Sequence, residues 1–277
     1  MSLAGVQPTY AEHEPPAALR PFVQCLWTRN VAPGGEAAPG HRVLPDGCVD
    51  LIITLAGDWA PAHAASREER IDRALFVGAM TSPLVFQSAP GVAFVGVRCR
   101  PGAARALFGV PASELTNLRV PVDELWRGDQ SLRPGGSDPI GALSRVLAER
   151  FRRASPAPRD VRAAVALLRR TRGRMRIGTL GTELGVTRQH LARRFAEHVG
   201  LSPKLLARIE RMRHVIHLAR GEARPSWSRI AYEAGYADQS HLVSEFGELV
   251  GATPGEWYDS ISSSPGADRL PNLVATQ

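Results

Sequence analysis

The 277-residue sequence contains a single lysine, Lys204, among 34 basic residues, and it has no long apolar run. The scarcity of lysine indicates a coding preference for arginine and excludes no function by itself. Because a run of about 18 apolar residues is absent, we expect no membrane-spanning helix and no membrane partner. Residues 1–16 lack a basic stretch followed by an apolar one, so we expect no signal peptide and a cytoplasmic protein.

The sequence also lacks the short motifs that mark common enzyme classes. It has no GxSxG nucleophile elbow, no P-loop and no GxGxxG fingerprint. Asp46 and Asp50 flank Cys48 and resemble an acid–base pair, but no histidine lies in this segment and Pro-Asp-Gly is a common turn sequence. We therefore expect neither an enzyme nor a cofactor, and an enzymatic N-terminal domain is the alternative.

Cysteine is scarce, and its spacing excludes the usual zinc and dithiol motifs. The three residues are Cys25, Cys48 and Cys99, an odd number with no CxxC pair. We expect reduced, partly buried thiols and no metal site. A thiol or redox sensor at Cys48 is a second alternative, and it requires an exposed thiol of low pKa.

The C-terminal half contains one unit twice. The first copy runs from Leu180 to Pro203 and the second from Ile230 to Pro254. Glycine, a His-Leu pair, phenylalanine and a closing glycine and proline recur at matching positions, with an offset of 50 residues before the turn and 51 after it. Such a repeat predicts that the same structural unit occurs twice in this half of the chain.

Each copy predicts a helix, a glycine turn and a second helix, which is a helix-turn-helix unit. Gly185 and Gly235 occupy the turns, where a positive φ is needed. Thr187 and Asp238 are placed to cap the second helices, expected at about 188–198 and 239–249. The two units span about 177–200 and 227–251.

The outward positions of the two second helices are the candidate DNA contacts. Arg193 and Gln189 lie one turn apart, and arginine and glutamine make bidentate contacts with guanine and adenine. For His190 and His241 two interpretations are open, namely phosphate contact or a packing network. The candidates are Thr187, Arg188, Gln189, His190, Arg193, Arg194, Gln239, Ser240, His241 and Ser244.

The double unit, with GYADQSHLVSEF in its second copy and a closing GxTP, resembles the DNA-binding domain of AraC/XylS-type transcriptional regulators over residues 160–258. The second unit departs from that family at Ser244 and Gly247, where basic residues are common. Glu245 and Glu248 add negative charge. The resemblance therefore implies that the first unit supplies most of the base recognition.

Positive charge is concentrated in the part of the chain that contains the repeat. The net formal charge is +1 over residues 1–158, +7 over residues 159–257 and −1 over the remaining tail. An excess of this kind is typical of a surface that binds phosphates.

The N-terminal part predicts strands, among them 49–55, 74–80, 82–88 and 91–100. An LPDGC-DL segment and a later VGV-PG segment resemble the N-terminal domain of a subset of AraC-type regulators, which implies a cupin-like fold. On this resemblance Cys48, Asp46 and Asp50 are candidate effector residues. Only two internal histidines, His41 and His63, are available for a cupin metal, so none is expected.

The expected fold is α+β, with a cupin-like N-terminal domain and an all-α domain. The predicted divisions are 1–151 for a sensor or dimerisation domain, 152–160 for a linker, 161–258 for the DNA-binding domain and 259–277 for a disordered tail. An amphipathic helix over 138–153 serves either packing or dimerisation, and a long, one-sided helix over 203–220 joins the two units.

Together these patterns predict a sequence-specific DNA-binding transcriptional regulator. Its partners are double-stranded DNA and, as further candidates, RNA polymerase, a small-molecule effector and a second copy of the chain.

Overall fold

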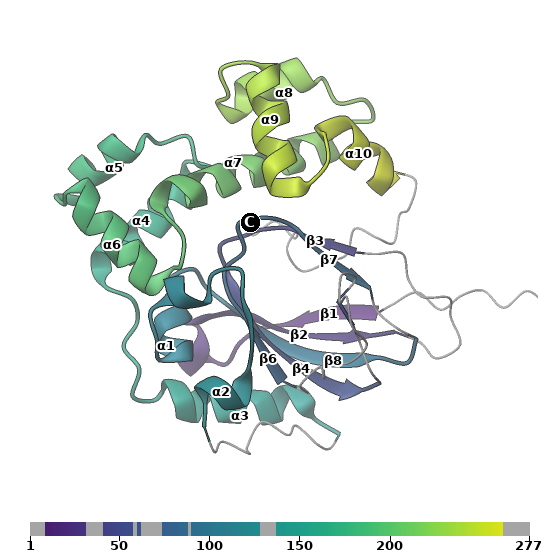
Figure 1. Ribbon diagram of the computed structural model, residues 1–277, viewed down its shortest axis with the longest axis vertical. Helices are drawn as coiled ribbons and strands as arrows, with labels where there is room; N and C mark the ends of the chain where they lie inside the picture. The colour runs from purple at the N-terminus through teal and green to yellow at the C-terminus, as the bar shows by residue number, and fades with distance from the viewer. Residues whose placement is uncertain are drawn as a thin grey trace, which may run out of the picture.

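The computed structural model describes residues 9–31, 41–57, 60–61, 74–87, 90–127 and 137–262, and it shows a strand-rich domain followed by a helical one (Figure 1). This order confirms the predicted α+β class, with a strand-rich N-terminal domain followed by a helical domain. Within the described residues, no helix combines the length and apolar character needed to cross a membrane.

Two antiparallel sheets form the N-terminal domain. The larger has the order β1-β2-β8-β4-β6-β9 and the smaller β3-β7-β5. The strands of the larger sheet are β1 (Thr9–His13), β2 (Val23–Asn30), β4 (Val49–Ala56), β6 (Ala74–Val77), β8 (Ala93–Cys99) and β9 (Arg119–Pro121). Those of the smaller sheet are β3 (His41–Val43), β5 (Ala60–Pro61) and β7 (Leu84–Gln87).

Strand β8 is the central strand of the larger sheet, as its sequence of small and β-branched residues predicts. In register, Val97 of β8 lies between Leu26 of β2 and Leu51 of β4, and all three side chains are fully buried. The strand pattern therefore places the domain core on one face of β8.

Short helices and one longer helix cover the sheet. They are the 3₁₀ helices η1 (Ala17–Leu19) and η2 (Ala112–Leu115), and the α-helices α1 (Ala104–Phe108), α2 (Val122–Leu125) and α3 (Pro139–Phe151). Leu143, Leu147 and Phe151 of α3 are buried in the same domain, and the Phe151 ring stacks on Phe22 at 4.4 Å. The apolar stripe of α3 is thus a packing surface, which removes the basis for assigning it to dimerisation.

Residues 1–16 are predicted from the sequence to be loosely attached, and the PGAARALFG segment predicts a helix that begins at Pro101. The described residues correct these two predictions and the start of the predicted tail. The first 16 residues are not all loosely attached, because β1 pairs with β2 along its whole length. Pro101 does not begin a helix, since α1 starts at Ala104 after a turn. Helix α10 (Pro254–Ser262) extends into the predicted tail. Residues 1–8, 32–40, 62–73 and 263–277, for which loops or disorder are expected, lie outside the described residues.

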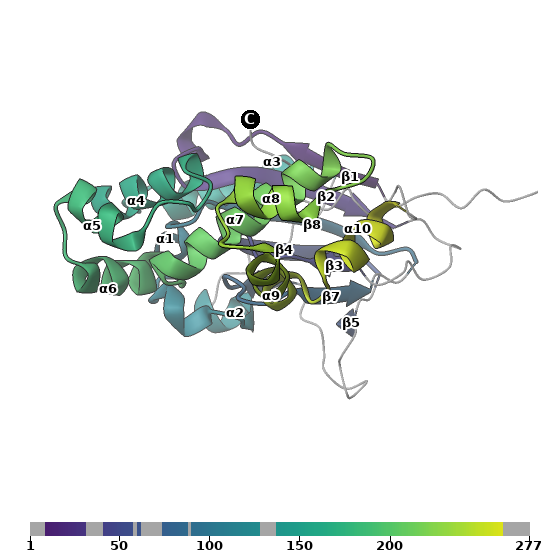
Figure 2. The same cartoon turned by 90° about the horizontal axis from the view of Figure 1, so that it is seen from above.

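The helical domain contains α4 (Arg159–Arg170), α5 (Ile177–Leu184), α6 (Arg188–His198), α7 (Pro203–Arg220), α8 (Trp227–Ala234), α9 (Gln239–Val250) and then α10. Seen from above, α7 runs between the group of α4, α5 and α6 and the group of α8 and α9 (Figure 2). The predicted connector thus joins the two helix-turn-helix units.

Helix α7 is buried on several sides, so the prediction of a one-sided apolar helix is wrong. Ile209, Met212 and Ile216 are buried as predicted, but so are Glu210 and His214. The helix packs against α4 on one side, against α8 and α9 on another, and contacts the N-terminal domain through Leu206. A helix enclosed in this way needs buried residues around most of its circumference.

Candidate nucleic-acid interface

The first helix-turn-helix unit consists of α5 and α6. Gly185 ends α5 with φ of 64°, and the Thr187 side chain accepts a hydrogen bond from the backbone N–H of His190 at 3.1 Å. Leu191 and Phe195 are fully buried, which fixes the rotation of α6 about its axis. The turn and the cap therefore lie where the sequence predicts them.

The exposed side of α6 carries Arg188, Gln189 and Arg193. Among the residues that the structure describes, none of these three side chains has a hydrogen bond or ion pair with another part of the protein. Their charged and amide groups are free for a ligand outside the chain. Arginine and glutamine on one exposed helical face match the donors and acceptors of guanine and adenine edges.

His190 and Arg194 point instead towards Asp160 at the start of α4. His190 Nε2 lies 3.0 Å and Arg194 Nε 3.8 Å from Asp160 Oδ2. Burial alone would raise the pKa of Asp160, but hydrogen bonds from His190 and the Val161 backbone hold that pKa below its usual value. These contacts favour the packing interpretation of His190, because they brace α6 against α4.

The second unit consists of α8 and α9. Asp238 accepts a hydrogen bond from the backbone N–H of His241 at 2.8 Å, and Leu242 and Phe246 are fully buried. The exposed side chains of α9 include those of Gln239, Ser240, His241 and Ser244, together with Glu248 further along the helix. The His241 ring meets Tyr236 edge to face at 5.3 Å, and its Nε2 lies 4.0 Å from Glu245 Oε2. This surface carries no arginine.

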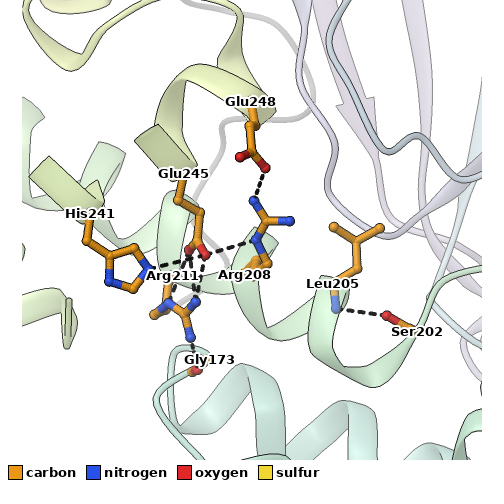
Figure 3. Close-up of polar contacts among 8 residues, drawn as sticks. All are labelled: Gly173, Ser202, Leu205, Arg208, Arg211, His241, Glu245 and Glu248. Carbon is orange, nitrogen blue, oxygen red and sulfur yellow. Dashed lines mark hydrogen bonds and ion pairs between the residues drawn. The ribbon is translucent and has the colours of Figure 1, made fainter. Parts of the chain in front are cut away.

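Glu245 does not add negative charge to the exposed surface, which corrects the sequence prediction. Its side chain is buried and lies between Arg208 and Arg211 of α7, while Glu248 also pairs with Arg208 (Figure 3). The spacing of Leu242, Glu245, Phe246 and Leu249 places Glu245 on the buried stripe of α9, and this signal was available in the sequence.

An ion pair within the helical domain removes one positive and one negative charge and leaves the net charge unchanged. The net positive charge of residues 159–257 therefore lies on arginines that have no carboxylate partner. Arg169, Arg208, Arg211 and Arg213 each pair with a carboxylate inside the helical domain. Other arginines of this domain are exposed to solvent, among them Arg162, Arg170, Arg174, Arg176, Arg188 and Arg193. The free positive charge therefore lies on the outer surface, where phosphates can reach it.

Asp46 and Asp50 of the N-terminal domain surround Arg98 of β8. Arg98 Nη2 lies 3.2 Å from Asp50 Oδ1 and Arg98 Nε 3.6 Å from Asp46 Oδ2, and Arg98 is 2% exposed. Asp46 also accepts a hydrogen bond from the Cys48 backbone N–H at 2.8 Å, which closes the predicted turn. Sequence interpretation missed Arg98, although an arginine within an apolar central strand is the signal of a buried partner.

Cys48 meets neither requirement of a thiol sensor. Its side chain is buried, and burial raises the pKa of its thiol. Burial raises the pKa of Cys25 as well, to about 12. Because the thiolate is the reactive form, burial and a raised pKa disfavour a sensor role, and the redox-sensor alternative is not supported.

The LPDGC segment lies against the helical domain. A Cβ on Gly47 would lie 2.6 Å from Leu206 Cδ1 of α7, and Arg169 Nη2 of α4 lies 3.9 Å from the Cys48 sulfur. A second contact joins η2 to the end of α6, where Thr116 Oγ1 donates to the Gly200 carbonyl at 2.6 Å. The two domains are therefore in direct contact at both α6 and α7.

Two helix-turn-helix units on one connecting helix, joined to a strand-rich domain, form the arrangement that the resemblance to AraC-type regulators implies. Residues 180–260 match the family described as "Helix-turn-helix domain", and residues 11–121 match the "Domain of unknown function (DUF6597)". The C-terminal part of the chain is thus an AraC-type helix-turn-helix domain.

Several solved structures are similar to this chain. ToxT from Vibrio cholerae is 12% identical, with a TM-score of 0.44, over 92% of this chain and 98% of that chain. A ToxT structure with a bound unsaturated fatty acid gives 12% identity and a TM-score of 0.42 over 93% and 97%. The C-terminal domain of AraT, a response regulator from Geobacillus stearothermophilus, gives 21% and 0.36 over 38% and 88%. No curated protein has significant sequence similarity to the chain.

Proposed function

We propose that this protein is a sequence-specific transcriptional regulator that binds two adjacent major-groove segments of double-stranded DNA through α6 and α9. The observation that supports this most strongly is the exposed face of α6, where Arg188, Gln189 and Arg193 have no partner among the described residues. Two helices that enter successive major grooves on one face of DNA lie about 34 Å apart. Helix α7 provides a continuous connection between them.

The first unit supplies most of the base recognition. Gln189 and Arg193 contact base edges, while Thr187 and Arg188 contact phosphates near the start of α6, and His190 and Arg194 hold α6 in place through Asp160. In the second unit Gln239, Ser240, His241 and Ser244 contribute weaker contacts, because serine offers a single, less selective hydrogen bond.

The N-terminal domain regulates the DNA-binding domain and performs no enzymatic reaction. Its contacts with α6 and α7 give a direct route by which an effector or a partner subunit can bias the position of the first unit. Cys48 lies at this boundary beside Arg169, and Asp46 and Asp50 flank it around Arg98. The candidate protein partners are RNA polymerase and a second copy of the chain. The proposed location is the cytoplasm.

Selection of binding sites from random DNA by the full-length protein tests the proposed function. We expect one strongly preferred segment and a second, weaker one about 10 base pairs away. The Gln189→Ala, Arg193→Ala double variant should lose the stronger preference and keep binding. If the wild-type protein binds all sequences equally, it is an architectural DNA-binding protein and the proposal is wrong.

A thermal-shift screen of the full-length protein tests regulation by a small molecule. Any compound that binds only the folded state raises its melting temperature by mass action. We expect one chemical class to raise the melting temperature and also to change DNA affinity. If compounds that shift melting leave DNA affinity unchanged, regulation by a partner protein becomes the better account.

A further inference from the structure

Arg211 of α7 joins three segments of the helical domain. Its Nη2 donates to both carboxylate oxygens of Glu245 in α9 at 2.9 Å, and its Nη1 donates to the Gly173 carbonyl at 3.2 Å (Figure 3). Gly173 lies in the turn between α4 and α5, at the entrance to the first helix-turn-helix unit. One guanidinium group on the connector therefore contacts the second unit and the turn that leads into the first unit.

The Arg211–Glu245 pair is shielded from water, which makes its geometry restrictive. The Glu245 side chain is 7% exposed and the Arg211 side chain 19%. Arg208 Nε donates to Glu245 as well, at 2.9 Å, and the Arg211 guanidinium lies 5.3 Å from the centre of the Tyr236 ring. A buried carboxylate that is paired on both sides loses much more by moving than an exposed one, because no water replaces its partners.

The pair constrains the rotation of α9 together with the fully buried Leu242 and Phe246. Ser244 is exposed and Glu245, the next residue, is buried, so a tie at Glu245 helps to fix the rotation of α9 about its own axis. That rotation decides the direction of Gln239, Ser240 and Ser244. On the first-unit side, a Cβ on Gly173 would lie 1.9 Å from the Ala207 carbonyl oxygen, so this turn lies directly on the α7 backbone.

We propose that Arg211 and Glu245 are positioning residues that set the separation and relative orientation of α6 and α9, and hence the spacing between the two DNA segments that the protein recognises. This inference depends on the proposed function, because it assumes that both helices bind DNA. In this proposal, a buried ion pair influences which DNA sequences are bound although the pair itself does not touch the DNA.

The spacing dependence of DNA binding tests this inference. Each inserted base pair moves the second segment by about 3.4 Å and rotates it around the DNA axis. With the wild-type protein we expect one inserted base pair between the two preferred segments to weaken binding by about tenfold. With Glu245→Gln the penalty should fall to about threefold or less, while the base preference of the first segment stays unchanged.

Glu248→Gln is the matched control, since Glu248 also pairs with Arg208 but its side chain is 61% exposed. It should keep the wild-type spacing dependence. Arg211→Lys retains the charge without the two-sided contact and should give an intermediate penalty, which supplies a second measurement if Glu245→Gln does not fold.

Two results separate failure of this inference from failure of the proposed function. If both folded variants, Glu245→Gln and Arg211→Lys, keep the full spacing penalty, the ion pair only stabilises the domain and the inference is wrong. If the wild-type protein shows no second segment at all, two-segment binding itself is wrong.

Discussion

Arginine side chains in this protein serve two distinct purposes. Arg98, Arg208 and Arg211 are paired with buried or half-buried carboxylates, where an unpaired charge would be strongly unfavourable. Arg188 and Arg193 extend into solvent without a partner among the described residues. Because arginine stays charged in both settings, its environment alone decides whether it stabilises the fold or binds a ligand.

At the residue scale, Arg193→Ala should reduce sequence specificity more than Ser244→Ala. The two positions correspond across the repeat, so the comparison holds the geometry nearly constant. A bidentate arginine–guanine contact contributes about 1–3 kcal/mol of discrimination, and a serine hydroxyl contributes less. Binding-site selection with both variants measures the difference. A larger loss with Ser244→Ala would show that the second unit is the main determinant of specificity.

Gly47 allows a second prediction at the residue scale. Gly47→Ala places a methyl group against Leu206, whereas Gly109→Ala has a similar φ of 81° and nothing within 4 Å. Both variants should lose about 1–2 kcal/mol from the left-handed backbone. Gly47→Ala should lose about 1 kcal/mol more through the domain contact. Urea denaturation of both variants measures this, and equal losses would show that Leu206 adapts without strain.

At the scale of single elements, α7 determines the arrangement of the helical domain. It packs against α4, α8 and α9 and contacts the LPDGC turn, so it carries buried residues around most of its circumference. Two of these are the polar residues Glu210 and His214. Glu210 is paired with Arg169 and Arg213, while His214 Nε2 lies 3.2 Å from an Arg172 nitrogen.

His214 should make the stability of the protein depend on pH between about 6.5 and 4. Burial, followed by the Arg172 charge, lowers the pKa of His214 to about 4, against about 6.5 in an unfolded chain. The unfolded state therefore binds more protons in this window, and stability is lost as the pH falls through it. We expect a loss of about 1–3 kcal/mol, and a smaller loss in this window for His214→Gln. Denaturation curves at pH 7, 6 and 5 test this expectation. If the free energy of unfolding of His214→Gln depends on pH as steeply as that of the wild-type protein, the expectation is wrong.

At the scale of the whole molecule, the two domains are in contact through α1, η2 and the LPDGC turn. Arg105 Nη1 of α1 lies 3.2 Å from Glu197 Oε1 at the end of α6, and Thr116 bonds to Gly200 beyond it. The main cluster of buried apolar residues extends through both domains. A change in the N-terminal domain can therefore reach α6 through packed side chains, without any change in the linker.

The charge distribution of the whole molecule predicts binding to DNA that depends steeply on salt. Each neutralised phosphate contributes a slope of about −0.9 to a log–log plot of affinity against salt concentration. Arg188→Ala should therefore make the slope shallower by about 1. Arg145→Ala removes the same charge from an exposed position on α3 and should leave the slope unchanged. Equal effects of both variants would indicate a non-specific response to net charge.

The amino-acid sequence by itself determined the features of this protein that arise from local interactions. The caps Thr187 and Asp238, the glycine turns and the exposed side chains of Arg188, Gln189 and Arg193 lie where the repeat predicts them. These features depend on residues a few positions apart, whose spacing already fixes their geometry.

Only the tertiary structure decided what the buried polar residues do. Glu245 pairs with Arg211, 34 residues away, and Cys48 lies beside Arg169, 121 residues away. The sequence shows Asp46, Asp50 and Cys48 as a chemically promising cluster, but both carboxylates are paired with Arg98, and burial raises the pKa of the Cys48 thiol. The physical reason is that desolvation and charge pairing depend on which distant segments meet, and no local pattern in the sequence specifies that meeting.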